Sequence, residues 1–418
     1  MLESQINDKK VEISKASPTP FRYLWFGMMI SLIGDHLNKV GLIWFVNNNF
    51  EGVKGGTTLG FSMAIPMAIV GIFAGVIVDR LNRTTLLLSA DFIRAGIVLT
   101  MAALLITQTP NLYMISAFSI ILGVVSLLFN PSVQSLLPDL AEGEHSKIVK
   151  MDAWILGTIT TFSIIGPAIA GLLIPYVPIF IVLLIDGISF LLSAALIYLM
   201  TKELRKKGID THVPASKRKN ILLDAKDGLS FVFKHPVLGP QFSVFPLLEA
   251  ITYAIPFLLP ALLSNISNGD SQYFGLLLGV WAVGRVVSMS IFPKTKLKNR
   301  RGIVFSLNLF IQAFALLVIS LSSSLYFMFV GFFLLGLPAG AAMISMSSYV
   351  QGEMPKEMRG RIFSSMSSLA MFLIPLGTLV LGSCSQLYGT KNTLAFASLI
   401  LVACGIFISS KKAVREIR

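Results

Sequence analysis

The run Gly71-Ile-Phe-Ala-Gly75-Val-Ile-Val-Asp79-Arg80-Leu-Asn-Arg83 lies between two long apolar segments of the chain. Glycines at this spacing let neighbouring helices approach closely in a membrane. The arginines that follow hold a short loop on the cytoplasmic side, where basic residues accumulate. The run therefore predicts a tight cytoplasmic turn between two membrane-spanning helices.

The composition agrees with a membrane protein, because 54% of the residues are hydrophobic and only 13% are charged. A soluble domain carries about 25% charged residues. Apolar windows of roughly 20 residues are long enough to cross a bilayer. The sequence thus predicts an all-α integral membrane protein with twelve transmembrane helices, and no cleavable signal peptide in the polar residues 1–20. The predicted spans cover residues 21–46, 57–79, 84–106, 111–137, 152–174, 177–200, 239–264, 272–293, 303–323, 325–350, 362–386 and 390–410.

The basic residues indicate the orientation in the membrane. Most of the 34 Lys and Arg residues fall in the two tails and in alternate loops, whereas the loops between them hold only Lys54 and Lys391. By the positive-inside rule, both termini are expected to be cytoplasmic, in a multi-pass protein of the cell (inner) membrane. This alternation also explains the net charge of +13, so no nucleic-acid partner is predicted.

The longest polar stretch divides the chain into two halves. It is rich in lysine and separates the sixth predicted span from the seventh. Two related halves around a central cavity are the architecture expected of a secondary transporter. The predicted organisation is a cytoplasmic amino tail (1–20), a six-helix bundle (21–200), a cytoplasmic linker (201–235), a second six-helix bundle (236–410) and a cytoplasmic tail (411–418).

Asp35 is predicted near the middle of the first span, where an ionisable residue costs roughly 2.5–3.5 kcal/mol. Together with Ser31, Asn38 and Lys39 it forms a polar stripe on one helix face, which must point into the protein. In one interpretation Asp35 lines the transport path and takes up a proton. In the other, Asp35 and Lys39 neutralise each other as a structural ion pair one turn apart.

Three further charged residues are predicted at membrane depth. Glu249 in the seventh span and Arg285 in the eighth either line the central cavity or form a salt bridge between the helices. Asp186 in the sixth span is assigned to the same central set, although a structural role is favoured for it. The predicted central cavity therefore contains Asp35, Asn38, Lys39, Asp186, Glu249 and Arg285.

A second group of residues is assigned to a gate on the cytoplasmic side. Asp91 and Arg94 are one turn apart in the third span, which suits an intrahelical pair that also reaches the Asp79–Arg80 loop. In the fifth span, a cluster of glycines around a proline predicts a kinked helix with a small-residue packing face. The gate set is Gly75, Asp79, Arg80, Arg83, Asp91 and Arg94, and the kink set is Gly166, Pro167 and Gly171.

Several kinds of chemistry lack the residues they need. The chain has no G-x-x-x-x-G-K-[ST] phosphate loop, no metal-ligand spacing of histidines and no nucleophile–base constellation. Cys384 and Cys404 suit packing within the last two spans. The sequence therefore predicts a protein that is not an enzyme, binds no cofactor or metal, and draws its energy from an ion gradient.

These motifs identify a family by resemblance. They are Ser31-Leu-Ile-Gly-Asp35, the Asp79–Arg83 loop, Asn130-Pro131, Ile185-Asp186 and Arg359-Gly-Arg361. The chain resembles the branch of the major facilitator superfamily that contains macrolide exporters and enterobactin-type siderophore exporters. The resemblance implies a monomer that exports an amphipathic small molecule in exchange for protons by alternating access. Two alternatives stay open: a proton-coupled importer of a nutrient or peptide, and a membrane sensor without a transport cycle.

Overall fold

The structure is a computed structural model that describes residues 19–71, 77–78, 81–107, 111–208, 230–264, 266, 270–295, 297 and 300–415. Within these residues all regular elements are helices. The long helices are α2 (Thr19–Asn49), α3 (Val53–Ile69), α5 (Arg83–Thr107), α6 (Leu112–Leu140), α7 (His145–Leu173), α8 (Ile179–Lys206), α10 (Leu238–Leu263), α11 (Ser271–Ile291), α12 (Arg301–Leu321), α13 (Leu325–Glu353), α14 (Lys356–Tyr388) and α15 (Thr390–Ser410). Two short elements, η2 (Phe292–Lys294) and α16 (Lys412–Arg415), follow α11 and α15.

Among the described residues, ten helices are long and apolar enough to cross a membrane. They are α5 to α8 and α10 to α15, which confirms the prediction of a helical, multi-pass membrane protein. The other two long helices differ for simple reasons. Helix α2 carries Arg22, Asp35 and Lys39 along its length, and α3 has only 17 residues. The count of twelve spans stays a prediction.

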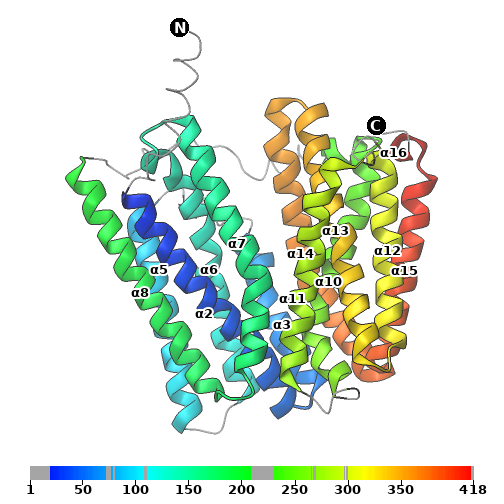
Figure 1. Cartoon of the computed structure of the whole chain (residues 1–418), viewed down its shortest axis with the longest axis horizontal. Coiled ribbons are helices and arrows are strands. Elements are labelled where there is room, and N and C mark those ends of the chain that lie inside the picture. The colour runs from blue at the N-terminus through cyan, green and yellow to red at the C-terminus, as the bar shows by residue number, and fades with distance from the viewer. Residues whose placement is uncertain are drawn as a thin grey trace.

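The helices form two groups that follow the order of the chain. Figure 1 shows α2 and α5 to α8 on one side of the molecule and α10 to α15 on the other, with α3 near their boundary. In the first group α8 packs against both α2 and α5, and in the second α12 packs against α13 and α15. Helix α2 begins and α15 ends at the same end of the molecule, which we call the terminal end.

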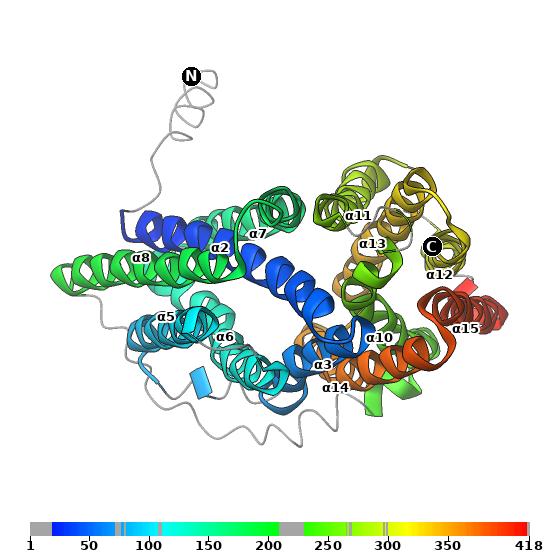
Figure 2. The same ribbon diagram turned by 90° about the horizontal axis from the view of Figure 1, so that it is seen from below.

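The two groups pack closely at the end remote from the terminal end. Helix α7 contacts α11, and α3 contacts α10 and α14, along two separate lines that Figure 2 shows from below. At the first line a Cβ atom on Gly275 would lie 2.5 Å from the Cα of Gly171. At the second, a Cβ atom on Gly60 would lie 2.7 Å from the ring of Phe257. Glycine is therefore needed at both lines, where the helix backbone lies this close to another backbone or to an aromatic ring.

The predicted small-residue face of α7 is used in these contacts. Gly171 faces Gly275 of α11, while Gly166 faces His36 of α2, whose ring would lie 2.5 Å from an added Cβ. Pro167 lies inside α7, which continues as one helix through it. Toward the terminal end the two helix groups diverge instead of packing together (Figure 1). The close contacts thus join the groups mainly at one end.

Candidate functional site

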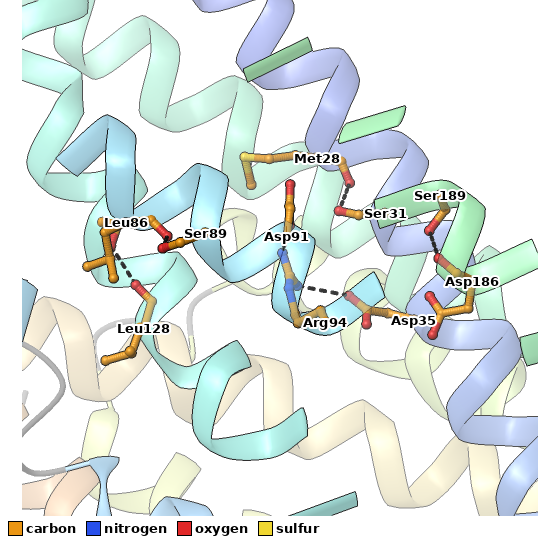
Figure 3. Close-up of polar contacts among 11 residues, drawn as sticks. Met28, Ser31, Asp35, Leu86, Ser89, Asp91, Arg94, Leu128, Asp186 and Ser189 are labelled. Carbon is orange, nitrogen blue, oxygen red and sulfur yellow. Dashed lines mark hydrogen bonds and ion pairs between the residues drawn. The ribbon is translucent and has the colours of Figure 1, made fainter. Parts of the chain in front are cut away.

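A cluster of charged side chains lies inside the first helix group. Arg94 of α5 forms an ion pair with Asp91 one turn earlier on the same helix. Its Nη1 atom also lies 4.0 Å from the Oδ2 atom of Asp35 on α2. On the other side of Asp35, Asp186 of α8 accepts a 2.6 Å hydrogen bond from the amide of Asn38. Figure 3 shows Asp35 between Arg94 and Asp186.

Aromatic packing fixes the Arg94 side chain in this cluster. Its guanidinium carbon lies 4.4 Å from the ring centre of Phe129 on α6 and 4.3 Å from that of Phe190 on α8. Only 3% of the side chain is exposed. Stacking on aromatic faces suits the planar guanidinium and leaves its N–H groups free to bind carboxylates. The two rings therefore aim Arg94 at both Asp91 and Asp35.

Asp35 differs from the other two carboxylates in its exposure. Its side chain is 39% exposed, whereas Asp91 and Asp186 are fully buried. Gly34 makes the close approach of α2 to α8 possible, because a Cβ atom there would lie 2.5 Å from Asp186 Oδ1. The side of the cluster that protein atoms leave uncovered is therefore Asp35, whereas Asp186, assigned to the cavity lining by the sequence, is covered.

The cluster contains more negative than positive charge. Three carboxylates, Asp35, Asp91 and Asp186, lie around the guanidinium of Arg94, which contacts the first two, and the charge of Lys39 also acts on Asp35. In the described part of the chain, the buried atoms Asp91 Oδ2 and Asp186 Oδ1 have no hydrogen-bond partner. Burying uncompensated charge is expensive unless something neutralises it. The arrangement is therefore suited to hold a proton.

Within the described residues no group of His, Cys, Asp and Glu side chains has the geometry of a metal site.

The structure does not contain the Asp35–Lys39 ion pair that the sequence offered as an alternative. Between these two described residues no N···O distance is within 4.0 Å, and the nearest cationic partner of Asp35 is Arg94. The Nζ atom of Lys39 instead lies 5.6 Å from the ring centre of Tyr253 on α10. Lys39 is exposed and reaches toward the second helix group.

Glu249 and Arg285 also do not form the salt bridge that was the alternative to a cavity role. Both are described, and neither has an ion-pair partner within 4.0 Å in that part of the chain. The Nη2 atom of Arg285 lies 3.9 Å from the sulfur of Met343 on α13, and the side chain is exposed. Glu249 is half-buried on α10, one helical turn before Tyr253.

Helix periodicity shows which way Arg285 faces. Val283 and Ile291 are exposed on α11, and Arg285 lies two positions, about 200°, from Val283. It shares the opposite stripe with Phe274, whose ring centre lies 5.8 Å from that of Trp44 on α2. Arg285 therefore faces the first helix group, as Lys39 faces the second.

The predicted cytoplasmic gate is only partly observable. Gly75, Asp79 and Arg80 lie outside the described residues. Arg83 donates a 2.7 Å hydrogen bond to Asp139 at the end of α6, a partner that the local sequence pattern does not predict. The predicted Asp91–Arg94 pair is present, but it joins Asp35 in the central cluster. The separation into a gate set and a central set therefore does not hold for these two residues.

A family model described as "Transmembrane secretion effector" matches residues 13–417 of the chain. The chain belongs to this family of major facilitator transporters. The family and the relatives are membrane transporters and not enzymes. This confirms the resemblance and the prediction that the protein is not an enzyme.

The sequence similarity to known relatives covers nearly the whole length of this chain. The Staphyloferrin A transporter of Staphylococcus aureus is 23% identical over 90% of this chain and 92% of its own. Macrolide efflux protein A of Streptococcus pyogenes is 21% identical over 95% of this chain and 97% of its own. The putative bacilysin exporter of Bacillus subtilis is 22% identical over 93% of both chains.

Solved structures of other transporters have the same fold. A mutant of the peptide transporter POT superposes with a TM-score of 0.73 at 12% identity, over 96% of both chains. The nucleoside transporter NupG gives a TM-score of 0.65 at 15% identity, over 93% of this chain and 99% of its own. At such identities the likeness concerns the fold alone.

Proposed function

We propose that this family member exports an amphipathic small organic molecule in exchange for protons, by alternating access between six-helix halves at 21–200 and 236–410. The observation that carries the proposal is the shared guanidinium of Arg94. It contacts Asp35, whose side chain is partly exposed, and Asp91, whose side chain is buried. A carboxylate in that position can exchange a proton with one side of the membrane at a time.

The coupling step follows from charge balance in the cluster. When Asp35 is ionised, it competes with Asp91 for the guanidinium of Arg94. When Asp35 is protonated, Arg94 forms an ion pair with Asp91 alone. The two states change the charge on α2 where it packs against α8. Proton binding and substrate binding then favour opposite-facing conformations, which is the requirement for exchange.

The conformation observed supports entry from the cytoplasm. The helix groups diverge at the terminal end, where the basic residues indicate the cytoplasmic side. At the other end, the Gly171–Gly275 contact brings α7 and α11 together. We therefore assign the structure to the inward-facing state, in which an exporter loads its substrate. The protein is proposed to act as a monomer in the cell membrane, with both termini cytoplasmic.

The charges that face the other helix group favour a substrate with acidic oxygen groups. Lys39 and Arg285 are exposed, come from opposite helix groups and have no carboxylate within 4.0 Å in the described structure. An unpaired cation at membrane depth calls for an anionic partner. Of the two predicted classes, macrolides and siderophores, an iron-chelating siderophore supplies such groups. The relatives that carry siderophore and macrolide names support the same two classes.

Proton release from energised inside-out vesicles tests the proposal directly. A panel of macrolides, dyes and siderophores is added to vesicles that contain the wild type, Asp35→Asn or Asp152→Asn. Asp152 is a matched control, because it is exposed on α7 away from the cluster. We expect at least one compound to release protons with the wild type and the control but not with Asp35→Asn.

Two other outcomes of the vesicle experiment would favour the alternative functions. Proton movement that accompanies substrate entry into right-side-out vesicles would show the nutrient or peptide importer instead. Silence across the whole panel from a folded wild-type protein would contradict exchange and favour the non-transporting sensor.

A further inference from the structure

A groove of about 700 Å³ lies between α5 and α8 on the outer side of the first helix group. One face of each helix lines it, at spacings that place the residues on single helical stripes. From α5 come Thr84, Thr85, Leu88, Ser89 and Phe92, and from α8 come Tyr198, Thr201, Lys202, Arg205 and Lys206. The transport site described above uses none of these side chains.

The groove changes character along its length. Because α5 begins and α8 ends at the terminal end, the cations and threonines lie at that end and the aromatic residues lie deeper. The aromatic part is open to the surroundings, with Phe92 55% and Tyr198 59% exposed. About eight residues, roughly 12 Å, separate Tyr198 from Lys206 along α8. A molecule in the groove would therefore have a polar end at the membrane surface and an apolar part in the bilayer.

Two of the three cations at the polar end have no carboxylate partner among the described residues. Lys206 pairs with Glu203 at 2.7 Å, but Lys202 and Arg205 have no carboxylate within 4.0 Å among the described residues. Their positions near a helix end let them extend to the membrane surface, while hydroxyl groups of Thr84, Thr85 and Ser89 line the same end. Two neighbouring cations with hydroxyl groups nearby suit a phosphate group.

We propose that this groove binds an anionic phospholipid of the leaflet on the terminal side. Lys202 and Arg205 bind the phosphate, and one acyl chain lies along Phe92 and Tyr198. Basic pockets between membrane helices attract anionic headgroups, and this groove adds an apolar wall for the chain. The lipid would join α5, which carries Arg94, to α8, which carries Asp186, and so stabilise the packing around the central cluster.

The test uses the full-length protein in detergent with phosphatidylglycerol or phosphatidylcholine of the same acyl chains. Native mass spectrometry counts bound lipids, and thermal unfolding measures stabilisation. We expect phosphatidylglycerol to bind and stabilise more strongly than phosphatidylcholine. In Lys202→Gln/Arg205→Gln, its apparent affinity should fall about 30-fold, since each surface cation contributes about fivefold.

Two variants keep the result interpretable. Lys147→Gln/Lys150→Gln removes two positive charges from the terminal end of α7 and should leave the preference for phosphatidylglycerol intact. Lys202→Arg/Arg205→Lys keeps the charge and should retain binding, which separates loss of the site from loss of folding. Equal binding of the two lipids by the wild type would overturn the proposal. So would an equal loss in the α7 control, or a loss seen only with Lys234→Gln, which lines a separate basic pocket near α14.

Discussion

The central arginines of the two helix groups have opposite surroundings. In the first group, Arg94 is buried between two aromatic rings and contacts two carboxylates. In the second, Arg285 is exposed, and its nearest polar contact is the sulfur of Met343. Glu249, near Arg285, likewise has no ion-pair partner within 4.0 Å in the described structure.

The different surroundings of Arg94 and Arg285 suit different steps of a transport cycle. A cation held rigidly among several carboxylates responds to protons, because protonation changes the charge balance without any large movement. A cation left exposed and unpaired costs free energy until a ligand arrives. We therefore expect substitutions in the Arg94 cluster to break proton coupling or stability, and those at Arg285 and Glu249 to change substrate binding.

The largest expected effect separates Asp35 from Glu249. Asp35→Asn should reduce proton-driven substrate accumulation to the level of protein-free vesicles, because the exposed carboxylate of the cluster no longer takes up a proton. Exchange of substrate for substrate across the same membrane should continue. Glu249→Gln should instead lower the substrate concentration needed for half-maximal transport, because it removes a negative charge near Arg285 that repels an anionic substrate, and it should keep the protons released per substrate. Both are measured in proteoliposomes with a pH electrode and labelled substrate.

A reversal would break the comparison. If Glu249→Gln abolished proton release while Asp35→Asn changed only substrate affinity, the proton site would belong to the second helix group.

The next effect compares the two arginines in unfolding experiments. Arg94→Gln removes the cation that Asp35 and Asp91 contact, and removal of one partner from a buried ion pair costs about 3–5 kcal/mol. Arg285→Gln should change the free energy of unfolding by less than about 0.5 kcal/mol, since the side chain is exposed and unpaired. Denaturation in detergent micelles measures both, with Arg94→Lys as the variant that keeps the charge. Equal losses for Arg94→Gln and Arg285→Gln would contradict the distinction.

The helical membrane architecture was predictable because the periodicity and length of apolar runs depend on local sequence. The Asp91–Arg94 pair was predictable for the same reason, as its spacing places both residues on one helix face. The partner of Asp35 was not. Local spacing favoured Lys39, whereas tertiary packing brings Arg94 from α5 to Asp35 and directs Lys39 toward Tyr253.

The aromatic residues that aim Arg94 were not predictable either. Phe129 and Phe190 are two among 30 phenylalanines, and nothing in their local sequence distinguishes them from lipid-facing or packing residues. The partner of Arg83 had a weak signal, because Asp139 is an acidic residue at the terminal end of a span, opposite a basic loop. Interactions between distant helices were thus the part of the site that sequence patterns did not contain.

A smaller effect compares two buried amides. Asn38 donates to the carboxylate of Asp186 at 2.6 Å, while the Asn308 side chain in α12 accepts a 2.7 Å hydrogen bond from Gln312. Hydrogen bonds to charged groups contribute about 1.5–3 kcal/mol and neutral ones about 1 kcal/mol. Asn38→Ala should therefore destabilise the protein more than Asn308→Ala in the same unfolding assay. A larger loss for Asn308→Ala would mean that Asp186 is held neutral and gains little from Asn38.

The smallest effect is a pH dependence that lies outside the membrane, at the start of α10. The Nδ1 atom of His235 accepts hydrogen bonds from the backbone N–H groups of Val237 and Leu238, each 3.2 Å long. Burial lowers the pKa of His235 below its ordinary value of about 6.5. The neutral ring is therefore favoured in the folded protein, and its contribution is present above that pH and lost as the pH falls through the folded-state pKa.

Because the ring is only half-buried, we expect this loss to stay under about 1 kcal/mol, the size of a helix cap. His235→Asn keeps a side-chain acceptor that does not titrate in this range, so its free energy of unfolding should change less between pH 7.5 and pH 5.5 than that of the wild type. The same variant should keep the pH dependence of transport, which we assign to Asp35 in the first helix group. A transport profile that flattened in His235→Asn, with Asp35 intact, would move proton coupling from the buried cluster to the linker side of α10.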